Sequence, residues 1–244
     1  MKPVAFLVAT ALAATPAFAF DHHGKDWNFG DGTTPEEWSK VNPDYAMCDA
    51  GDMQSPIDLG SSKVIGNITV MTNYGATGGK LVVGEEKVQV DFAPGQFMHS
   101  GTQHFNLLQV HFHTPAEHAF DGERHPLVAH FVHATDDGAL GVIGVMFVEG
   151  DANPELDKII AAMTTGAGTD VMLDTSAMIP ADLTVYRYMG SLTTPPCSEG
   201  VNWHVASNTM TASAEQIEAL YEALGPSARS VQPLGNRLLV APAE

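Results

Sequence analysis

The chain has 244 residues, with 29 acidic against 11 basic side chains and a formal net charge of −18. This balance argues against nucleic acid or anionic lipid as a partner, because both carry the same sign of charge. The length suits one large β-rich domain or two small ones, and no linker, repeat or low-complexity stretch divides the sequence.

The N-terminus has the pattern of a secretory signal peptide. Lys2 precedes an apolar run from Val4 to Ala14, and Ala17-Phe18-Ala19 follows as an A-x-A cleavage site. We therefore predict a signal peptide at residues 1–19 and a mature domain over residues 20–244. The apolar run is too short to span a bilayer, and no later segment approaches twenty apolar residues. The sequence predicts an exported protein, periplasmic or secreted, without a membrane anchor.

Two cysteines, Cys48 and Cys197, lie far apart in the sequence. In an oxidising compartment an even pair is most simply a disulfide. Closing a loop of that size contributes roughly 5 kcal/mol to stability in the chain-entropy model. The alternative is two buried free thiols.

The first half of the chain predicts one helix start and one β segment. Residues Thr34 to Trp38 offer a capping threonine, a proline at the first helical position and a glutamate that can reach back to the cap. From Leu81 to Phe92 the sequence is typical of a strand with one buried face. The apolar residues there alternate with polar ones: Val88, Val90 and Phe92 with Lys87, Gln89 and Asp91.

Histidines mark the next predicted strand, Phe105 to His113. Side chains two apart in a strand point to the same face, so His111 and His113 should lie side by side. The same count places Phe105, Leu107 and Gln109 on their face and Leu108, Val110 and Phe112 on the other.

A second predicted strand supplies another histidine. The segment from Thr114 to Pro126 contains Asp121-Gly122 and lets the chain reverse. Leu127 to His133 then reads as a strand, with His130 on the face of Val128 and Val132 and with His133 on the opposite face beside Phe131.

Three imidazoles on two neighbouring strands are typical of zinc binding. Three protein ligands leave the fourth tetrahedral position free for water. Neutral imidazoles leave the charge of the dication almost undiminished, which favours ionisation of that water. Alone, His111-Phe112-His113 is a weak signal, because two strand histidines are more often satisfied polar side chains than metal ligands.

The second half predicts three strands and two helices. Leu140 to Val148 is nearly all apolar, as expected of a buried central strand. Leu183 to Tyr188 and Val201 to Ala206 should be strands that flank the segment 191–196. Asn153-Pro154 should cap a helix to Met163, and Ser213 with Gln216 another that ends at Leu224-Gly225-Pro226.

Along nearly its whole predicted mature length the sequence resembles the α-class carbonic anhydrases, with matching segments in the family's order. These are Trp27-Asn28-Phe29-Gly30, Gln54-Ser55-Pro56-Ile57, residues 109–118 (QVHFHTPAEH), His130-Phe131-Val132-His133, residues 190–196 (GSLTTPP), Val201-Asn202-Trp203 and Val231-Gln232-Pro233-Leu234. The resemblance implies a mainly β (α+β) single domain with a large twisted, mostly antiparallel central sheet and a few short surface helices.

The resemblance also implies the function: reversible, zinc-dependent hydration of carbon dioxide to bicarbonate and a proton, by attack of zinc-bound hydroxide. The Zn²⁺ ligands would be His111, His113 and His130. Thr193 would accept a hydrogen bond from the hydroxide and donate its own to Glu117, which fixes the lone pair that faces the substrate.

Several supporting residues are implied in the same way. Gln109 would hold the ring of His111. A disulfide at Cys197 would pin the loop that carries Thr193, and Ser55-Pro56 and Pro195-Pro196 match cis prolines of the family. The residues that would line the substrate pocket are Val132, Val142, Leu192, Thr194, Val201 and Trp203.

Two positions depart from the family's pattern. Most members have a glutamate two residues before the third zinc histidine, where it accepts that ring's free N–H, and Val128 stands there instead. His130 should then be oriented by a backbone carbonyl or a water, and zinc should be held more weakly. Glu86 occupies the place of a proton-shuttling histidine, and a carboxylate of ordinary pKa is a poor proton acceptor near neutrality. We therefore expect proton transfer to limit turnover.

Two alternatives share these residues: a non-catalytic carbonic-anhydrase-related binding module and a periplasmic zinc esterase with a cleft for a larger substrate. The three histidines, together with Glu117 and Thr193, favour catalysis. The expected partner is the small-molecule substrate, and the sequence leaves a homodimer open.

Overall fold

One twisted sheet dominates the described part of the chain, residues 26–30, 34–61, 64–68 and 70–243 of a computed structural model. The sheet has thirteen strands among these residues, in the hydrogen-bonded order β1-β13-β10-β11-β8-β7-β6-β4-β3-β9. Off this path, β12 pairs with β8, and β2 pairs with β5, which pairs with β6. The predicted signal peptide, residues 1–19, lies outside the described residues.

The strands are β1 (Val64–Ile65), β2 (Val70–Thr72), β3 (Ala76–Gly84), β4 (Lys87–Phe92), β5 (Phe97–Ser100), β6 (Gln103–His113), β7 (Leu127–Ala134), β8 (Leu140–Glu149), β9 (Asp170–Asp174), β10 (Val185–Ser191), β11 (Glu199–Ala206), β12 (Met210–Ala212) and β13 (Val240–Ala241). The helices are α1 (Trp38–Val41), α2 (Met47–Ala50), α3 (Pro154–Met163) and α4 (Ala214–Leu224), with 3₁₀ turns η1 (Pro43–Tyr45), η2 (Leu59–Ser61) and η3 (Thr175–Met178).

Most neighbouring strands are antiparallel, while β8 runs parallel to β11 and β12, and β1 runs parallel to β13. The predicted fold class, a mainly β single domain with a large, mostly antiparallel sheet and a few short helices, is confirmed. No helix in the described ranges is long and apolar enough to cross a membrane.

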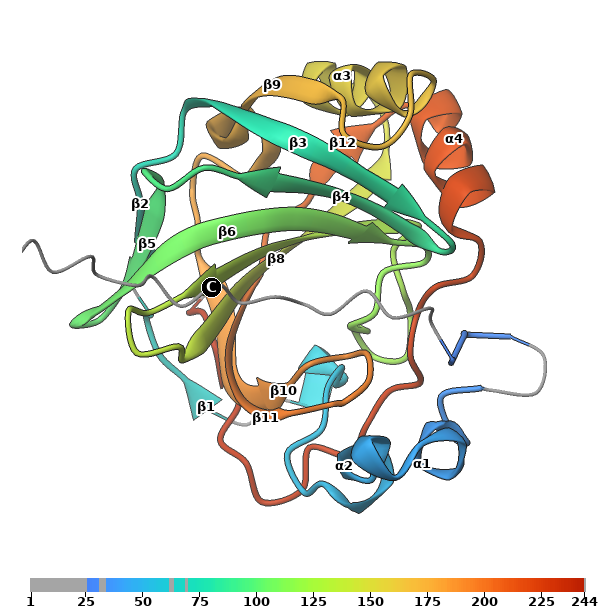
Figure 1. Cartoon of the computed structure of the whole chain (residues 1–244). Coiled ribbons are helices and arrows are strands. Elements are labelled where there is room, and N and C mark those ends of the chain that lie inside the picture. The colour runs from blue at the N-terminus through green and yellow to red at the C-terminus, as the bar shows by residue number, and fades with distance from the viewer. Residues whose placement is uncertain (1–25, 31–33, 62–63, 69, 244) are drawn as a thin grey trace, which may run out of the picture.

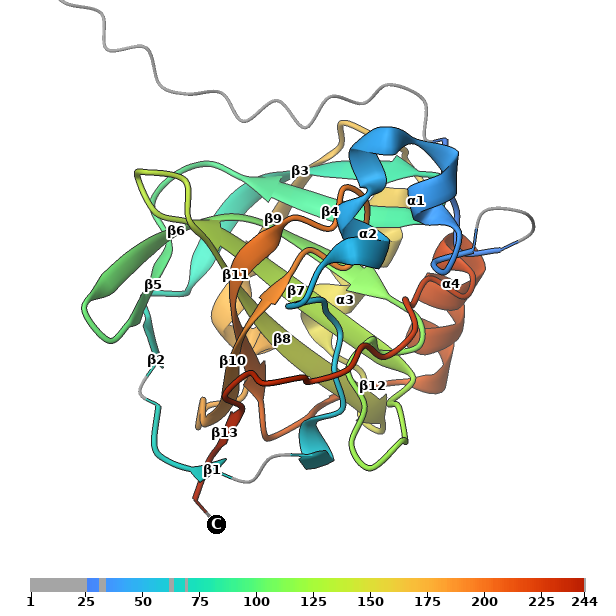
Figure 2. The same cartoon turned by 90° about the horizontal axis from the view of Figure 1, so that it is seen from below.

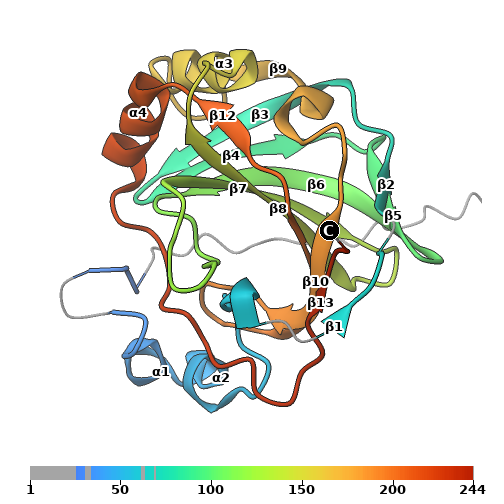
Figure 3. The ribbon, with the colours of Figure 1, turned by 180° about the vertical axis from the view of Figure 1, so that it is seen from behind.

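The helices lie at opposite ends of the sheet. α3 and α4 sit together beside β9 and β12, and α1 and α2 lie at the other end (Figure 1). Seen from behind, β10, β13 and β1 form the edge of the sheet nearest α2 (Figure 3). After α4 the C-terminal segment crosses the sheet to reach β13 (Figure 2). This segment brings Arg229 against Trp38 and Cys48.

Both predicted long helices are confirmed with their caps. The side chain of Asn153 accepts a hydrogen bond from the Glu155 N–H at the start of α3, and Ser213 and Gln216 form a capping box on α4. The predicted start of the first helix is wrong. α1 begins at Trp38 without a side-chain cap, and the backbone carbonyl of Thr34 accepts the Glu37 N–H at 2.8 Å in a preceding turn.

The β segment predicted over Leu81 to Phe92 is a hairpin. β3 and β4 pair antiparallel around a turn at residues 85–86, and Glu86 has a φ of 51°. A turn of two glutamates carries no glycine or asparagine, the usual sequence signal for positive φ. Val88 and Val90 are fully buried as the alternation predicted, whereas Phe92 is only partly buried.

A β-bulge changes the faces of β6. The register against β7 shifts between Leu107 and Gln109, so one residue is left over. Phe105 and Leu107 therefore share a face with Val110 and not with the histidines, and their predicted placement beside His111 is wrong.

The two faces of the sheet carry different cores. The larger apolar cluster joins one face to α3 and α4 and includes Phe131, Ile143 and Leu220. The smaller cluster on the other face includes Val132 and Trp203. His111, His113 and His130 belong to this second face, where the ring of Trp203 packs against His130.

Candidate metal centre

Strand pairing alone brings the three predicted ligands together. His111 on β6 lies directly opposite His130 on β7, and His113 is two residues further along β6. One nitrogen of each ring lies within 4.8 Å of the corresponding nitrogen of the other two. His113 and His130 are buried and His111 is half-buried.

Hydrogen bonds on the far side of two rings determine which nitrogen faces the centre. The Nδ1–H of His111 donates to Gln109 Oε1 at 2.9 Å. The Nδ1–H of His113 donates to the backbone carbonyl of Ser227 at 2.6 Å. Each ring therefore presents an unprotonated Nε2 inward.

The third ring presents its other nitrogen. Glu117 Oε2 lies 3.6 Å from His113 Nε2 and 3.8 Å from His130 Nδ1, so these two nitrogens face the same point. The Nε2 of His130 is buried and has no hydrogen-bond partner in the described part of the chain.

These residues fit a zinc ion. Burial is the main cause that holds the pKa of His111 and of His130 well below its ordinary value, and the neighbouring histidines add to the shift. Both rings therefore stay neutral, which is the state that coordinates metal. Three imidazole nitrogens turned toward one another are the donor set of a catalytic zinc site.

A buried carboxylate lies beside the histidines. Glu117 Oε1 accepts the backbone N–H of Arg229 at 3.1 Å. Its Oε2 has no hydrogen-bond partner among the described residues, so the predicted bond from Thr193 to Glu117 stays a prediction. Thr193 is buried, and Oε2 is the oxygen that could accept its hydroxyl proton.

Most residues predicted to line the substrate pocket belong to one apolar cluster, and their role as a pocket stays a prediction. Val132, Val142, Val201 and Trp203 are buried in the smaller apolar cluster, and Leu192 packs against them. The ring centroids of Trp203 and His130 are 5.0 Å apart. Thr194 is half-buried in the loop after β10.

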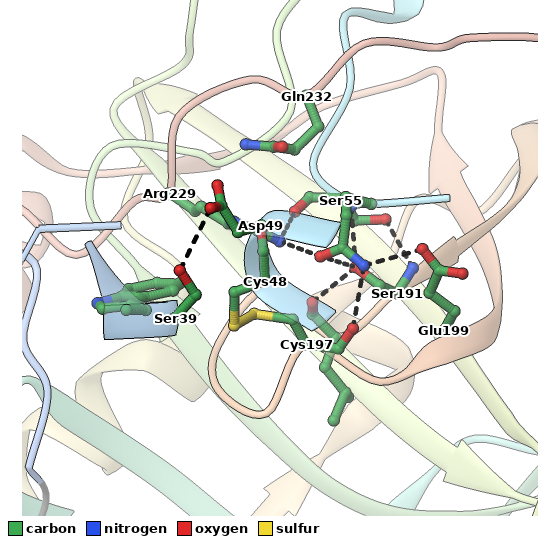
Figure 4. Close-up of a disulfide and its surroundings, with 12 residues drawn as sticks. Ser39, Cys48, Asp49, Ser55, Ser191, Cys197, Glu199, Arg229 and Gln232 are labelled. Atoms are coloured by element: carbon green, nitrogen blue, oxygen red, sulfur yellow. Dashed lines mark hydrogen bonds between the residues drawn. A yellow bond between two sulfur atoms is a disulfide. The ribbon is translucent and has the colours of Figure 1, made fainter. Parts of the chain in front are cut away.

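The predicted disulfide between Cys48 and Cys197 is present, with its Cα atoms 4.9 Å apart (Figure 4). The backbone N–H of Cys197 donates to the Thr194 carbonyl at 2.9 Å, and the Gln54 amide donates to the Cys197 carbonyl at 3.1 Å. The loop that carries Thr193 is thereby tied to α2. The predicted cis peptides at Ser55-Pro56 and Pro195-Pro196 are also present, with an unpredicted third at Thr114-Pro115.

Arg229 connects the region of the disulfide with Glu117, which lies beside the histidines. This role was not predicted from the sequence. Its buried guanidinium donates to Gln54 Oε1 at 2.9 Å, to the Ser55 carbonyl at 2.8 Å and to the Cys48 carbonyl at 2.6 Å. Its backbone N–H holds Glu117. These partners lie 112 to 181 residues away in the sequence, and a single arginine in an irregular segment carries no local signal for them.

Glu86 lies in the turn before β4. Gln89, three residues later, pairs with His111 across β4 and β6. Lys87 is close enough for its charge to contribute to the lowered pKa of His111. The proton-transfer role of Glu86 stays a prediction.

Comparison with known proteins gives one consistent result. The family model described as eukaryotic-type carbonic anhydrase matches residues 33–241. A carbonic anhydrase of Pectobacterium carotovorum is 35% identical over 219 residues, 88% of this chain and 90% of that protein.

Solved structures agree with this result. The α-carbonic anhydrase of Thermovibrio ammonificans in complex with sulfanilamide has a TM-score of 0.80 at 36% identity, covering 89% of this chain and 100% of that one. Dioscorin in complex with ascorbate has a TM-score of 0.81 at 30% identity, covering 88% and 97%. Together with the three-histidine centre, these matches show that the chain belongs to the α-class, or eukaryotic-type, carbonic anhydrase family.

Proposed function

We propose that the protein interconverts carbon dioxide with bicarbonate and a proton, at a zinc ion held by His111, His113 and His130. The observation that carries the proposal is the convergence of three imidazole nitrogens within 4.8 Å of one another, with Gln109 and the Ser227 carbonyl hydrogen-bonded to two of the rings. When bound, zinc supplies a water that is acidic enough to ionise near neutral pH.

We propose Glu117 and Thr193 as the residues that orient the nucleophile. Arg229 fixes the carboxylate through Oε1, which leaves Oε2 to accept the Thr193 hydroxyl proton. Thr193 can then only accept a hydrogen bond from the attacking oxygen, and this directs the oxygen's lone pair toward the substrate. Neither residue gains or loses a proton in this role.

The proposed substrate site is the apolar wall beside His130. Carbon dioxide is small and uncharged, so it needs close apolar contact and no charged clamp. Val132, Val142, Val201 and Trp203 would provide that surface.

The disulfide and the bacterial relatives indicate an extracytoplasmic protein. We propose the finer statement that the chain is periplasmic or secreted after removal of residues 1–19. N-terminal sequencing of the exported protein should begin at Phe20.

Stopped-flow measurement of carbon dioxide hydration on purified protein, with zinc content determined on the same sample, tests the proposed reaction. We expect hydration that disappears when a chelator removes zinc and returns when zinc is restored. His111→Gln should abolish it, whereas His104→Gln, on the same strand but exposed, should not. Zinc-loaded protein without hydration activity would refute the proposal.

One comparison favours a second candidate. The structural likeness to dioscorin in complex with ascorbate supports a binding module on the same fold. If the protein is such a binding module, calorimetry should show that it binds ascorbate, and the zinc-loaded protein should not hydrate carbon dioxide. An esterase would instead hydrolyse activated esters with little or no hydration.

A further inference from the structure

The third zinc ligand lies beside a second buried histidine, and both have an unpartnered nitrogen. The Nε2 of His130 and the Nδ1 of His118 have no hydrogen-bond partner among the described residues, and both side chains are at most 1% exposed. Their ring centroids are 6.4 Å apart, with the ring planes at 81°. Val128, on the same face of β7 as His130, offers neither nitrogen an acceptor.

The proton on His118 can be placed from its hydrogen-bond chain. Ser55 Oγ accepts the Ser191 N–H at 3.0 Å, and the acceptor that the described residues offer its own proton is Tyr188 OH at 2.8 Å. The Tyr188 proton then goes to His118 Nε2, also at 2.8 Å. The Nε2 of His118 thus accepts a hydrogen bond and carries no hydrogen, which leaves the proton of the ring on Nδ1.

The proton on His130 follows from the metal. Zinc on Nδ1 leaves the hydrogen on Nε2, so His130 and His118 both present an N–H donor. The ring of Trp203 packs against both, at 5.0 Å from His130 and 4.8 Å from His118, but its own N–H donates to the Ser191 carbonyl. Two buried donors without an acceptor would each cost about 1–3 kcal/mol.

We propose that one buried water accepts both N–H groups, and that His118 positions His130 for zinc through this water. A water has two lone pairs, and buried waters commonly satisfy such groups. The carboxylate of the family's usual glutamate would be replaced by the water, held by an uncharged chain of hydrogen bonds from Ser55 through Tyr188 to His118. The inference rests on the proposed zinc site.

A crystal structure of the zinc-loaded protein tests the water directly. We expect a water-strength density peak about 3 Å from both His118 Nδ1 and His130 Nε2. No peak, a halide identified by its anomalous signal, or a protein acceptor in its place would overturn the proposal. This arm needs only the natural chain, so it stands even if a variant fails to fold.

Zinc release to a chelator tests the positioning role. His118→Leu should release zinc about 10–100-fold faster than the natural protein. In a Val128→Glu background, where a carboxylate can hold His130 directly, the same substitution should change the rate by less than about threefold, a coupling that only neighbours in one network show.

His133→Leu is the matched control, since His133 is equally buried on β7 but faces the opposite side. It should lower stability and leave zinc release unchanged. Equal effects of His118→Leu in both backgrounds, or an equal effect of His133→Leu, would overturn the positioning role. Neither arm measures hydration, so an inactive protein that still binds zinc at the three histidines would refute the proposed function alone.

Discussion

Each zinc-facing nitrogen is selected by the contact that the other nitrogen of its ring makes. The side chain of Gln109 accepts a hydrogen bond from His111, and the backbone carbonyl of Ser227 accepts one from His113. His130 has no such partner among the described residues. Two ligands are thus braced by the protein and one is not, so the third should govern how long the metal stays.

Val128→Glu should slow the loss of zinc. A carboxylate two residues before His130 on the same face can accept its Nε2–H directly, and such partners change metal affinity by about 10–100-fold. The rate of zinc transfer to a chelator measures the effect. Val128→Leu, which adds bulk without an acceptor, is the control, and unchanged or faster loss in Val128→Glu would contradict the prediction.

Proton transfer should limit turnover, because Glu86 is predicted to occupy the place of the family's proton-shuttling histidine. Imidazole buffer should raise kcat, since it supplies a base with a pKa near neutrality, and Glu86→His should reduce the need for it. Stopped-flow hydration at several buffer concentrations checks both effects. A kcat that responds to neither would show that another step is limiting.

The side chains of the site were predictable, and its backbone partners were not. The three histidines, Glu117 and Thr193 stand in motifs that can be read locally. Ser227 accepts a hydrogen bond with its backbone carbonyl. Every residue has such a carbonyl, so the residue type at this position could not predict the contact. Arg229 acts through the C-terminal segment, whose path beside Cys48 is decided only when the whole sheet has formed.

At the scale of elements, a bulge in β6 could not be predicted from the sequence. Simple alternation puts Phe105 beside the histidines, but the bulge near Leu108 moves it to the larger core. A bulge depends on the pairing with a neighbouring strand, here β7, so the alternation of apolar and polar residues within one strand cannot predict it. The predicted strand over Phe105 to His113 is therefore present, but its predicted faces are wrong before the bulge.

Replacing both cysteines, Cys48→Ser with Cys197→Ser, should lower the free energy of unfolding by about 2–5 kcal/mol. It should also lower hydration activity, because the loop with Thr193 loses its tie to α2. Urea unfolding and stopped-flow assays measure the two effects. The chain has no other cysteine, so a reducing agent should reproduce both in the natural protein and neither in the variant. Full stability after reduction would contradict the prediction.

At the scale of the whole molecule, buried neutral histidines lie on both faces of the sheet. Burial lowers the pKa of His118, His133 and His204 to about 3 each. His133 accepts from Tyr74 OH at 2.6 Å and donates to the Gly141 carbonyl at 3.3 Å, and His204 Nε2 lies 2.7 Å from Ser100 Oγ. Each of these rings is packed and bonded as an uncharged group.

These rings should make the native protein sensitive to acid. Their pKa is about 3 when folded and about 6.5 when unfolded, so between these values the unfolded chain binds more protons. Stability is therefore complete above pH 6.5 and falls as the pH drops toward 3, by about 1.4 kcal/mol per pH unit for each ring.

Urea unfolding at pH 7, 6 and 5 measures this dependence. His133→Gln removes one such group and should show a shallower fall with pH than the natural protein, whatever its stability at pH 7. His104→Gln removes an exposed histidine and should leave the slope unchanged. The carboxylates and the zinc ligands contribute equally in all three proteins, so the difference in slope isolates the buried ring. Identical slopes in His133→Gln and the natural protein would show that His133 is not held neutral by burial.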